Sequence, residues 1–281
     1  GIRVDFKSME PDATVPGATS TDATGVSPKL AAHYKFNENF AVFGSYAHTE
    51  RLPTLDEIFS DDFASPVVNN YSLDLKKERS DNIEIGASAS GYDLFTLGDT
   101  LQIKGTVFHN KIKDYIERYR NQSPQYRNTG LATIYGAELE VAYESDRWFA
   151  NAGYSIIRGE NNTAISPTNP NGFLNTVAPD ELTVSFGHRI PDHGIKFGWK
   201  SRFVAEQDRV VGTATARLAT DAFSTHGIFA SWKPVEGHAL EGFELNASVE
   251  NIFNEQYKEY LSNDPEQGRT FKVSLAKQIG W

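Results

Sequence analysis

Apolar and polar residues alternate along most of this chain, and helical periodicity is nearly absent. The clearest case is FELNASVENIF at 243–253, where every second side chain is apolar through Val249. A period of two places successive side chains on opposite faces of a β-strand. The pattern predicts an all-β fold with about twelve strands, near 1–8, 27–36, 40–50, 80–91, 99–114, 130–144, 147–159, 181–190, 194–204, 221–233, 241–254 and 269–280.

The lengths of these segments and of their connections indicate a membrane protein. Most segments reach the roughly 9–11 residues that a tilted strand needs to cross a bilayer. Long connections alternate strictly with short ones, which fall at 37–39, 91–99, 144–147, 191–194 and 235–240. Outer-membrane barrels carry short turns on the periplasmic side and long loops outside. The chain is therefore predicted to form a transmembrane antiparallel β-barrel wall, with its long connections facing outward.

Charge and composition exclude several classes of function and site. The net charge of −10 argues against nucleic acid as a partner, and the absence of cysteine rules out disulfides and thiolate metal sites. No apolar run reaches the roughly 18 residues of a spanning helix. The first residues, GIRVDFKSM, lack the features of a signal peptide, so we expect this chain to be a piece of a longer protein.

Charged residues within the predicted strands fall in phase with one another. Charges of both signs suit a water-filled lumen or a polar interface inside a barrel, whereas a charge facing lipid at mid-depth costs about 2–4 kcal/mol. We therefore predict that one set of side chains points inward: Glu84, Lys104, Glu138, Glu140, Lys196, Lys200, Arg202, Glu244, Glu250 and Lys272.

The last strand, RTFKVSLAKQIGW, carries alternating apolar residues that end in phase with Trp281, and only Lys277 interrupts them. This pattern resembles the signal by which barrel-assembly machinery recognises outer-membrane substrates.

Four stretches resemble TonB-dependent outer-membrane receptors, in the order in which that family has them. ERLPTLDEIF at 50–59 resembles the box written FRAP in haem receptors, and LDLKKERSDNIEIG at 73–86 the strand that follows it. YGAELEVAY at 135–143 matches the family's G-x-E-x-E strand. VENIFNEQYKEYLSNDPEQGRTFK at 249–272 resembles its closing hairpin. The resemblance covers nearly the whole of residues 1–281.

The resemblance implies an architecture and partners. Such receptors have a barrel of about 22 strands with a plug inside, of which this chain would supply the C-terminal part, with the plug and the first strands missing. It implies a location in the outer membrane of a Gram-negative bacterium, contact with the lipid bilayer, and energy from the TonB–ExbB–ExbD complex. It also implies transport of an iron compound and no catalysis.

The closing loop favours haem, or a haemoprotein that delivers it, as the ligand, with a ferric siderophore as the alternative. Haem receptors often carry an iron-ligating histidine after the FRAP-like box, and no histidine lies between Arg51 and Arg79 here. A tyrosinate can also ligate haem iron, so Tyr71 is a candidate. Haem propionates would suit arginine. The predicted ligand contacts are His48, Arg51, Tyr71, Tyr257, Tyr260 and Arg269.

Three other classes remain open at this point. A self-contained outer-membrane enzyme would need Ser–His or Asp–His pairs near one rim, and neither these nor a Gly-x-Ser-x-Gly motif can be assembled. A passive porin would need a constriction loop or an internal helix. A soluble sandwich has no reason to alternate long and short connections. No histidine forms a pair at metal-ligand spacing, so no catalytic or metal site is predicted.

Overall fold

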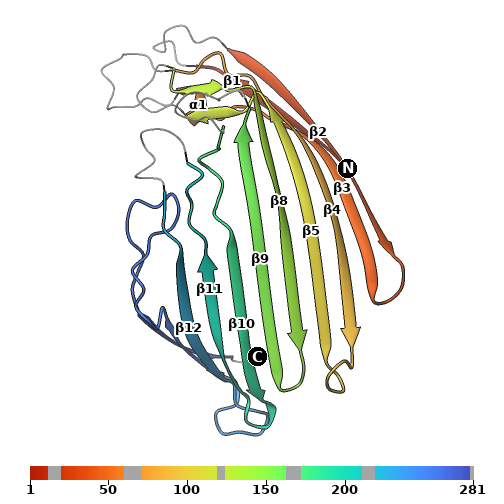
Figure 1. The fold of residues 1–281 in the computed structure, drawn as a ribbon, viewed down its shortest axis with the longest axis vertical. Coiled ribbons are helices and arrows are strands. Elements are labelled where there is room, and N and C mark those ends of the chain that lie inside the picture. Colours follow the sequence, from red (N-terminus) through yellow and green to blue (C-terminus); the bar gives the residue numbers. More distant parts are fainter. Residues whose placement is uncertain (12–19, 60–70, 119–123, 163–171, 211–218, 279–281) are drawn as a thin grey trace.

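The computed structural model describes residues 1–11, 20–59, 71–118, 124–162, 172–210 and 219–278. Within them, twelve antiparallel strands pair in chain order to form one sheet (Figure 1). The strands are β1 (Ile2–Met9), β2 (Thr21–Lys35), β3 (Phe40–Arg51), β4 (Glu78–Tyr92), β5 (Thr100–Lys113), β8 (Leu131–Glu144), β9 (Trp148–Asn161), β10 (Glu181–Ile190), β11 (Ile195–Val204), β12 (Phe223–Trp232), β13 (Phe243–Glu250) and β14 (Thr270–Lys277).

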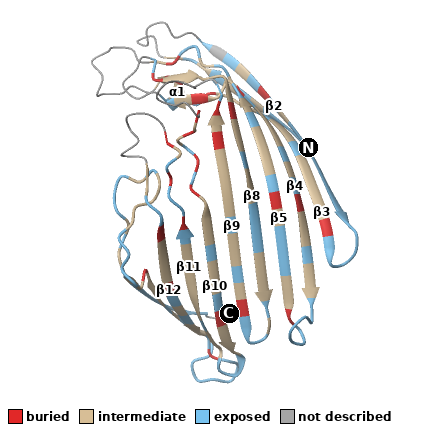
Figure 2. Ribbon diagram, in the orientation of Figure 1, coloured by how far each residue is buried: buried red, intermediate tan, exposed pale blue. Residues whose placement is uncertain are grey.

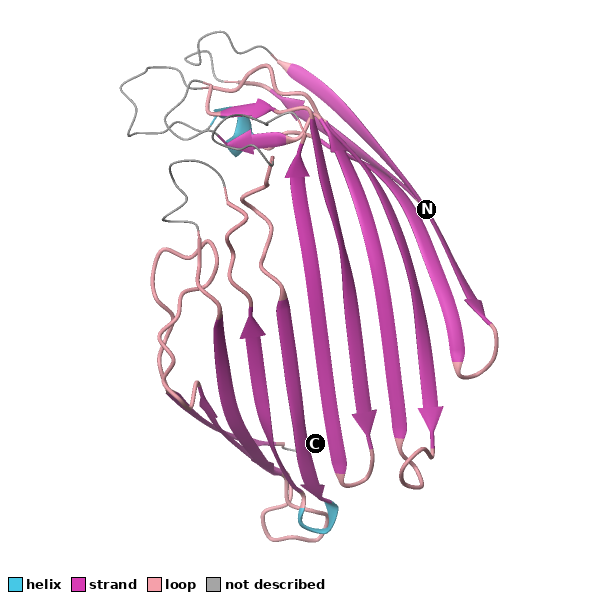
Figure 3. Ribbon diagram, viewed as in Figure 1, coloured by secondary structure: helices cyan, strands magenta, loops and turns pink. Residues whose placement is uncertain are grey.

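The sheet curves into an open trough whose two edges are β1 and β14 (Figure 3). Each of the twelve predicted strands is confirmed. The short turns gather at the lower end of the view in Figure 1, and the long connections gather at the upper end, which confirms the predicted alternation. Trp281, at the end of the predicted closing signal, lies outside the described residues.

Cross-strand register assigns every strand residue to one of two faces, because residues directly opposite each other in a ladder point the same way. Lys104 lies opposite Glu140 and Ser88, and Lys200 lies opposite Ser185 and Gly227. Followed across the sheet, these pairs define an inner face that carries all ten charged residues predicted to point inward. The opposite face is called the outer face below.

The outer face is apolar and open along the middle of the strands, and most of its charged residues, such as Asp81 and Arg158, lie toward the long connections. Ile83, Ile85, Val107 and Leu139, which share this face on β4, β5 and β8, keep 45–59% of their surface exposed. Figure 2 shows long exposed or half-exposed stretches along the strands of the sheet, with buried residues only at scattered points. A sheet with such a face requires an apolar environment around it.

On the inner face, four phenylalanines lie against glycines of the neighbouring strand. A Cβ added at Gly86 would lie 2.2 Å from Cζ of Phe43, its direct cross-strand partner. Aromatic rings over glycines of an adjacent strand help to hold the register of a sheet. The four pairs are Phe43–Gly86, Phe108–Gly136, Phe149–Gly187 and Phe229–Gly198.

The connections contain structure that the alternation does not predict. The long ones contain the helix α1 (Leu55–Phe59) and the hairpin of β6 (Ile116–Arg118) and β7 (Tyr126–Asn128), and a short one contains the 3₁₀ turn η1 (Pro191–His193). Helix α1 begins with a capping box, in which Glu57 N donates to Thr54 Oγ1 at 3.2 Å and Thr54 N donates to Glu57 Oε2 at 2.8 Å. Among the described residues, no helix is long and apolar enough to cross a membrane.

Candidate functional site

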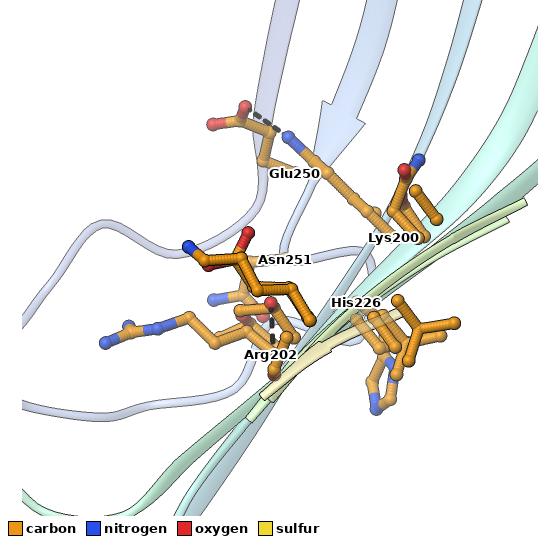
Figure 4. Close-up of a pocket in the computed structure, with 18 of the residues that line it drawn as sticks. Lys200, Arg202, His226, Glu250 and Asn251 are labelled. Carbon is orange, nitrogen blue, oxygen red and sulfur yellow. Dashed lines mark hydrogen bonds and ion pairs between the residues drawn. The ribbon is translucent and has the colours of Figure 1, made fainter. Parts of the chain in front are cut away.

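A cavity of about 1010 Å³ lies along the inner face, between β4 and β13 and below the connection 251–269. Small residues and polar residues line it, and charged side chains enter from β5, β8, β11, β13 and the connection 251–269. Figure 4 shows Lys200 reaching toward Glu250 across this space. The polar and charged side chains of the lining include Gln102, Lys104, Glu140, Asn151, Ser185, Lys200, Arg202, Thr225, His226, Glu250, Tyr257 and Glu266.

Three charged residues form a triad on the inner face of β11, β13 and β14. Lys200 Nζ lies 2.8 Å from Glu250 Oε1, and Lys272 Nζ lies 2.5 Å from Glu250 Oε2. All three side chains are between one third and three fifths exposed, so water screens their charges. The triad carries one excess positive charge and presents it to the cavity.

Arg202 lies one inner-face position further along β11, toward the long connections. It grips Glu181 with two hydrogen bonds, Nε to Oε1 at 2.9 Å and Nη2 to Oε2 at 2.8 Å, and Nη2 also donates to Glu259 Oε2 at 3.1 Å. Its guanidinium carbon lies 5.4 Å from the centre of the Phe223 ring, on which Tyr257 stacks at 4.3 Å. Arg202 therefore binds one glutamate from β10 and one from the connection 251–269.

The connection 251–269 is held by its own residues and by contacts with Arg202 and Asn175. The buried Asn251 donates to Glu255 O at 2.9 Å and accepts from Glu255 N at 2.8 Å. Arg269 Nε donates to Ile252 O at 2.9 Å, and the Tyr260 hydroxyl donates to Asn175 O at 2.7 Å. Burial raises the pKa of both Tyr257 and Tyr260, which keeps their hydroxyl groups protonated.

Arg51, at the end of β3, lies opposite Glu78 of β4. Its Nε donates to Glu78 at 2.5 Å, and its two terminal nitrogens bind the carboxylate of Glu57 in α1 at 2.9 and 3.0 Å. Burial tends to raise the pKa of Glu57, but Arg51 and the backbone N–H of Thr54 hold it below its ordinary value. Arg51 therefore joins two of the stretches that carried the family resemblance.

The other two predicted ligand contacts lie apart from the cavity. Tyr71 packs edge-on against Phe59 of α1, with ring centres 5.9 Å apart. His48 faces the outer side of β3, where its Nδ1 lies 2.9 Å from Asp81 Oδ1, and Tyr46 donates to the same oxygen at 2.8 Å. Of the six predicted contacts the structure brings only Tyr257 to the cavity.

The cavity is also lined by Lys200, Arg202 and Glu250, which were not predicted as contacts, and Lys272 binds Glu250. Their shared face was predicted from the alternation, but their contacts depend on which residues lie opposite one another in β11, β13 and β14. Glu259 carried no signal in the sequence. Within the described residues, no group of three or more His, Asp or Glu side chains is placed to hold a metal ion.

Comparison with known proteins gives a family match over most of the chain. The profile described as "TonB dependent receptor-like, beta-barrel" matches residues 1–252. The TonB-dependent heme receptor A of Haemophilus ducreyi is 32% identical, with 91% of this chain and 38% of the relative covered. The receptor of the same name from Haemophilus influenzae is 30% identical, over 91% and 37%. The hemin receptor of Yersinia pestis is 26% identical, over 99% and 40%.

Solved structures share the fold. The copper transporter OprC superposes with a TM-score of 0.80 at 22% identity, over 99% of this chain and 44% of OprC. The Serratia marcescens hemophore receptor HasR, in complex with HasA and heme, superposes with a TM-score of 0.66 at 20% identity, over 98% and 46%. The chain spans about two fifths of the length of the curated relatives named above.

Proposed function

We propose, on the premise that this chain belongs to the TonB-dependent receptor family, that it forms part of the wall of an outer-membrane importer of haem. Members of the family are receptors and transporters and not enzymes, they lie in the outer membrane of Gram-negative bacteria, and they interact with TonB. Haem is then a transported ligand and not a resident cofactor.

The observation that carries the choice of haem is the group of relatives. Two that are at least 30% identical over 91% of this chain, from different Haemophilus species, are named as heme receptors, and the Yersinia pestis relative as a hemin receptor. The solved structures include transporters named for copper and iron, and at 22% identity or less they support the fold alone.

The remaining parts of the transport system belong to the same proposal. The open edges at β1 and β14 fit a wall that pairs with further strands, as in the plugged barrels of about 22 strands. A plug inside that barrel would face the charged inner side of this sheet. The energy for transport would come from TonB together with ExbB and ExbD, acting on a region outside this chain.

Within the chain, the cavity supplies the chemistry for an anionic, aromatic ligand. Lys200 and Lys272 share one carboxylate, so a haem propionate can bind an ammonium group without removing the other from Glu250. Tyr257, stacked on Phe223, adds an aromatic surface beside them. Tyr71 remains the proposed iron ligand near the long connections, whereas Arg51, Tyr260 and Arg269 act by holding those connections in place.

A haem titration of the complete protein in detergent, followed through the Soret band, tests the proposal. We expect a saturable spectral shift that weakens in Lys200→Ala and Tyr71→Phe and persists in Tyr135→Phe, a control on the outer face. His48→Ala is expected to leave the shift unchanged, because its side chain faces away from the cavity. Absence of the shift, with binding of a ferric siderophore, would contradict haem import and assign siderophore uptake.

A further inference from the structure

The short turn between β4 and β5 exposes a cluster of apolar side chains. In this turn, residues 93–99, Leu94 is 51% exposed, Phe95 74% and Leu97 90%. The turns at 145–147 and 191–194, at the same end of the sheet, consist of Ser-Asp-Arg and Pro-Asp-His-Gly. The turn at 36–39 exposes Phe36, and the turn at 233–242 exposes Val235 and Leu240, five positions apart. Three large apolar residues within four positions therefore distinguish the turn 93–99 from the other short turns.

The turn is held rigid by two aspartates. The side chain of Asp99, which is 1% exposed, accepts the backbone N–H groups of Leu94, Phe95 and Thr96 at 2.7–2.8 Å. Asp93 accepts the N–H of Gly98 at 2.6 Å. Gly98 adopts φ 82°, a left-handed conformation that glycine tolerates without strain. The apolar tip is therefore presented by a preformed scaffold, and the only two charged residues of the turn are occupied in building it.

The turn bends toward the outer face. Leu94 lies over Gly91, where an added Cβ would come within 2.6 Å of Leu94 Cδ1. The Phe95 ring meets the Tyr143 ring edge-on at 5.7 Å, and the Tyr143 hydroxyl donates to Asp99 Oδ2 at 3.1 Å. Gly91 and Tyr143 both lie opposite Leu101, so all three belong to the outer face. The apolar tip is thus continuous with the apolar outer face of the sheet.

We propose that the turn 93–99 is a lipid anchor, which inserts Leu94, Phe95 and Leu97 into the phospholipid leaflet on the periplasmic side of the outer membrane. Short turns lie on that side, and aromatic residues concentrate at the bilayer interface of such barrels. Trp148, an outer-face residue at the start of β9, is 55% exposed close to the same end. The anchor fixes the depth at which β4 and β5 cross the bilayer.

Two features favour lipid as the occupant: the apolar tip of the turn is continuous with the apolar outer face, and the charged residues of the turn are engaged within it. A protein partner would meet a surface that merges with the lipid-facing side of β5 and β8 and that offers no free charged group to pair with. The proposal rests on the membrane embedding contained in the proposed function. It does not depend on which ligand is transported.

This chain contains no cysteine, so after replacement of any cysteine elsewhere in the complete protein by serine one label reports on one position. The test is Leu97→Cys carrying an environment-sensitive nitrobenzoxadiazole fluorophore, in the complete protein reconstituted in vesicles of phosphatidylethanolamine and phosphatidylglycerol. We expect blue-shifted emission, loss of quenching by aqueous iodide, and quenching by lipids with a nitroxide near the headgroup. The matched control is Asp146→Cys in the polar turn, for which we expect red-shifted emission and full quenching by iodide.

Two outcomes would overturn the anchor. Iodide quenching of the Leu97→Cys label equal to that of the control would place the turn in water. Protection from both iodide and lipid-borne nitroxide would show that protein covers the turn. A haem titration of the same samples separates the two proposals, because loss of haem binding with a lipid-embedded label would contradict only haem import. Heat-dependent gel mobility verifies that each labelled barrel is folded.

Discussion

The two faces of this sheet are built from the same strands and solve opposite problems. On the inner face the charged side chains meet partners, as in the pair Lys104–Glu140 at 3.2 Å and the triad around Glu250. On the outer face Ile85 and Val107 are more than half exposed. A soluble protein hides its apolar side and exposes its charged side, whereas this sheet turns its charges toward the cavity and leaves its apolar residues exposed on the opposite face. The environment of each face, and not its degree of burial, decides which residues it tolerates.

The largest effect should follow from moving a charge to the outer face. Val107 lies midway along β5, and Val107→Arg should destabilise the barrel by about 2–4 kcal/mol, because a guanidinium at mid-depth loses its hydration. Urea unfolding of the complete protein in vesicles measures the change. Gln102→Arg, on the inner face of the same strand, should cost much less. Equal losses for the two variants would contradict the assignment of the faces.

Filling the space beneath an inner-face phenylalanine should have the next largest effect. Gly86→Ala should cost about 1–3 kcal/mol, since the new methyl group would meet Phe43 Cζ at 2.2 Å and Gly105 O at 2.7 Å. Gly105→Ala is the matched control, because its Cβ would find open space on the outer face. Phe43→Leu should recover part of the stability of Gly86→Ala in the same unfolding experiment. No recovery would mean that the ring is not the source of the cost.

Removing a charge from the inner face should change stability least among the strand substitutions. Glu250→Gln leaves Lys200 and Lys272 without their shared carboxylate, yet all three side chains contact water. We expect a change of less than about 1 kcal/mol, the usual range for exposed ion pairs. Haem affinity is the sharper readout, since the variant carries one more net positive charge and should bind propionates more tightly. A stability loss as large as that of Val107→Arg would show that the inner face is dry.

The smallest effect concerns the point at which the outer face meets the long connections. Arg158, an outer-face residue near the end of β9, binds Asp180 with Nη2 to Oδ2 at 2.9 Å and lowers the pKa of that carboxyl. This stabilisation is complete above the ordinary aspartate pKa of about 3.9 and is lost as pH falls through the lowered folded-state value. The hydrogen-exchange protection of residues 172–180, relative to the intrinsic exchange rate at each pH, should fall only below about pH 4. Asp180→Asn should remove that acid dependence.

The strands were predictable because their signal is local and repeated. Each transmembrane strand carries the period of two over eight or more residues, so the alternation alone predicts its position and assigns the ten charged residues predicted to point inward to one face. Helix α1 has five residues and the strands β6 and β7 have three each, which is too few for a hydrophobic period to be recognised. The capping box of Thr54 and Glu57 is the one local sequence feature that indicates α1.

The candidate site was less predictable, for two physical reasons. His48 lies in FAVFGSYAHTER, where residues on both faces are apolar, such as Phe43 on the inner face and Val42 on the outer face. Alternation therefore could not predict which face His48 occupies. The contact between Lys200 and Glu250 joins residues fifty positions apart, and only the pairing of β11, β12 and β13 brings them together. The face that a residue occupies depends on its own strand, whereas its contacts depend on how the strands pair in the sheet.

The clamp around Arg51 bears on how cargo is inferred from sequence. Glu78 accepts both from Arg51 and from the backbone N–H of Ile116 at 2.7 Å, so the FRAP-like box, the strand after it and the β6–β7 hairpin form one mechanical unit. Loss of Glu78 would leave both Arg51 and the backbone N–H of Ile116 without this acceptor, whatever molecule passes through the barrel. Signatures drawn from this box therefore track the inheritance of a loop scaffold, and transport specificity can diverge beneath an unchanged signature.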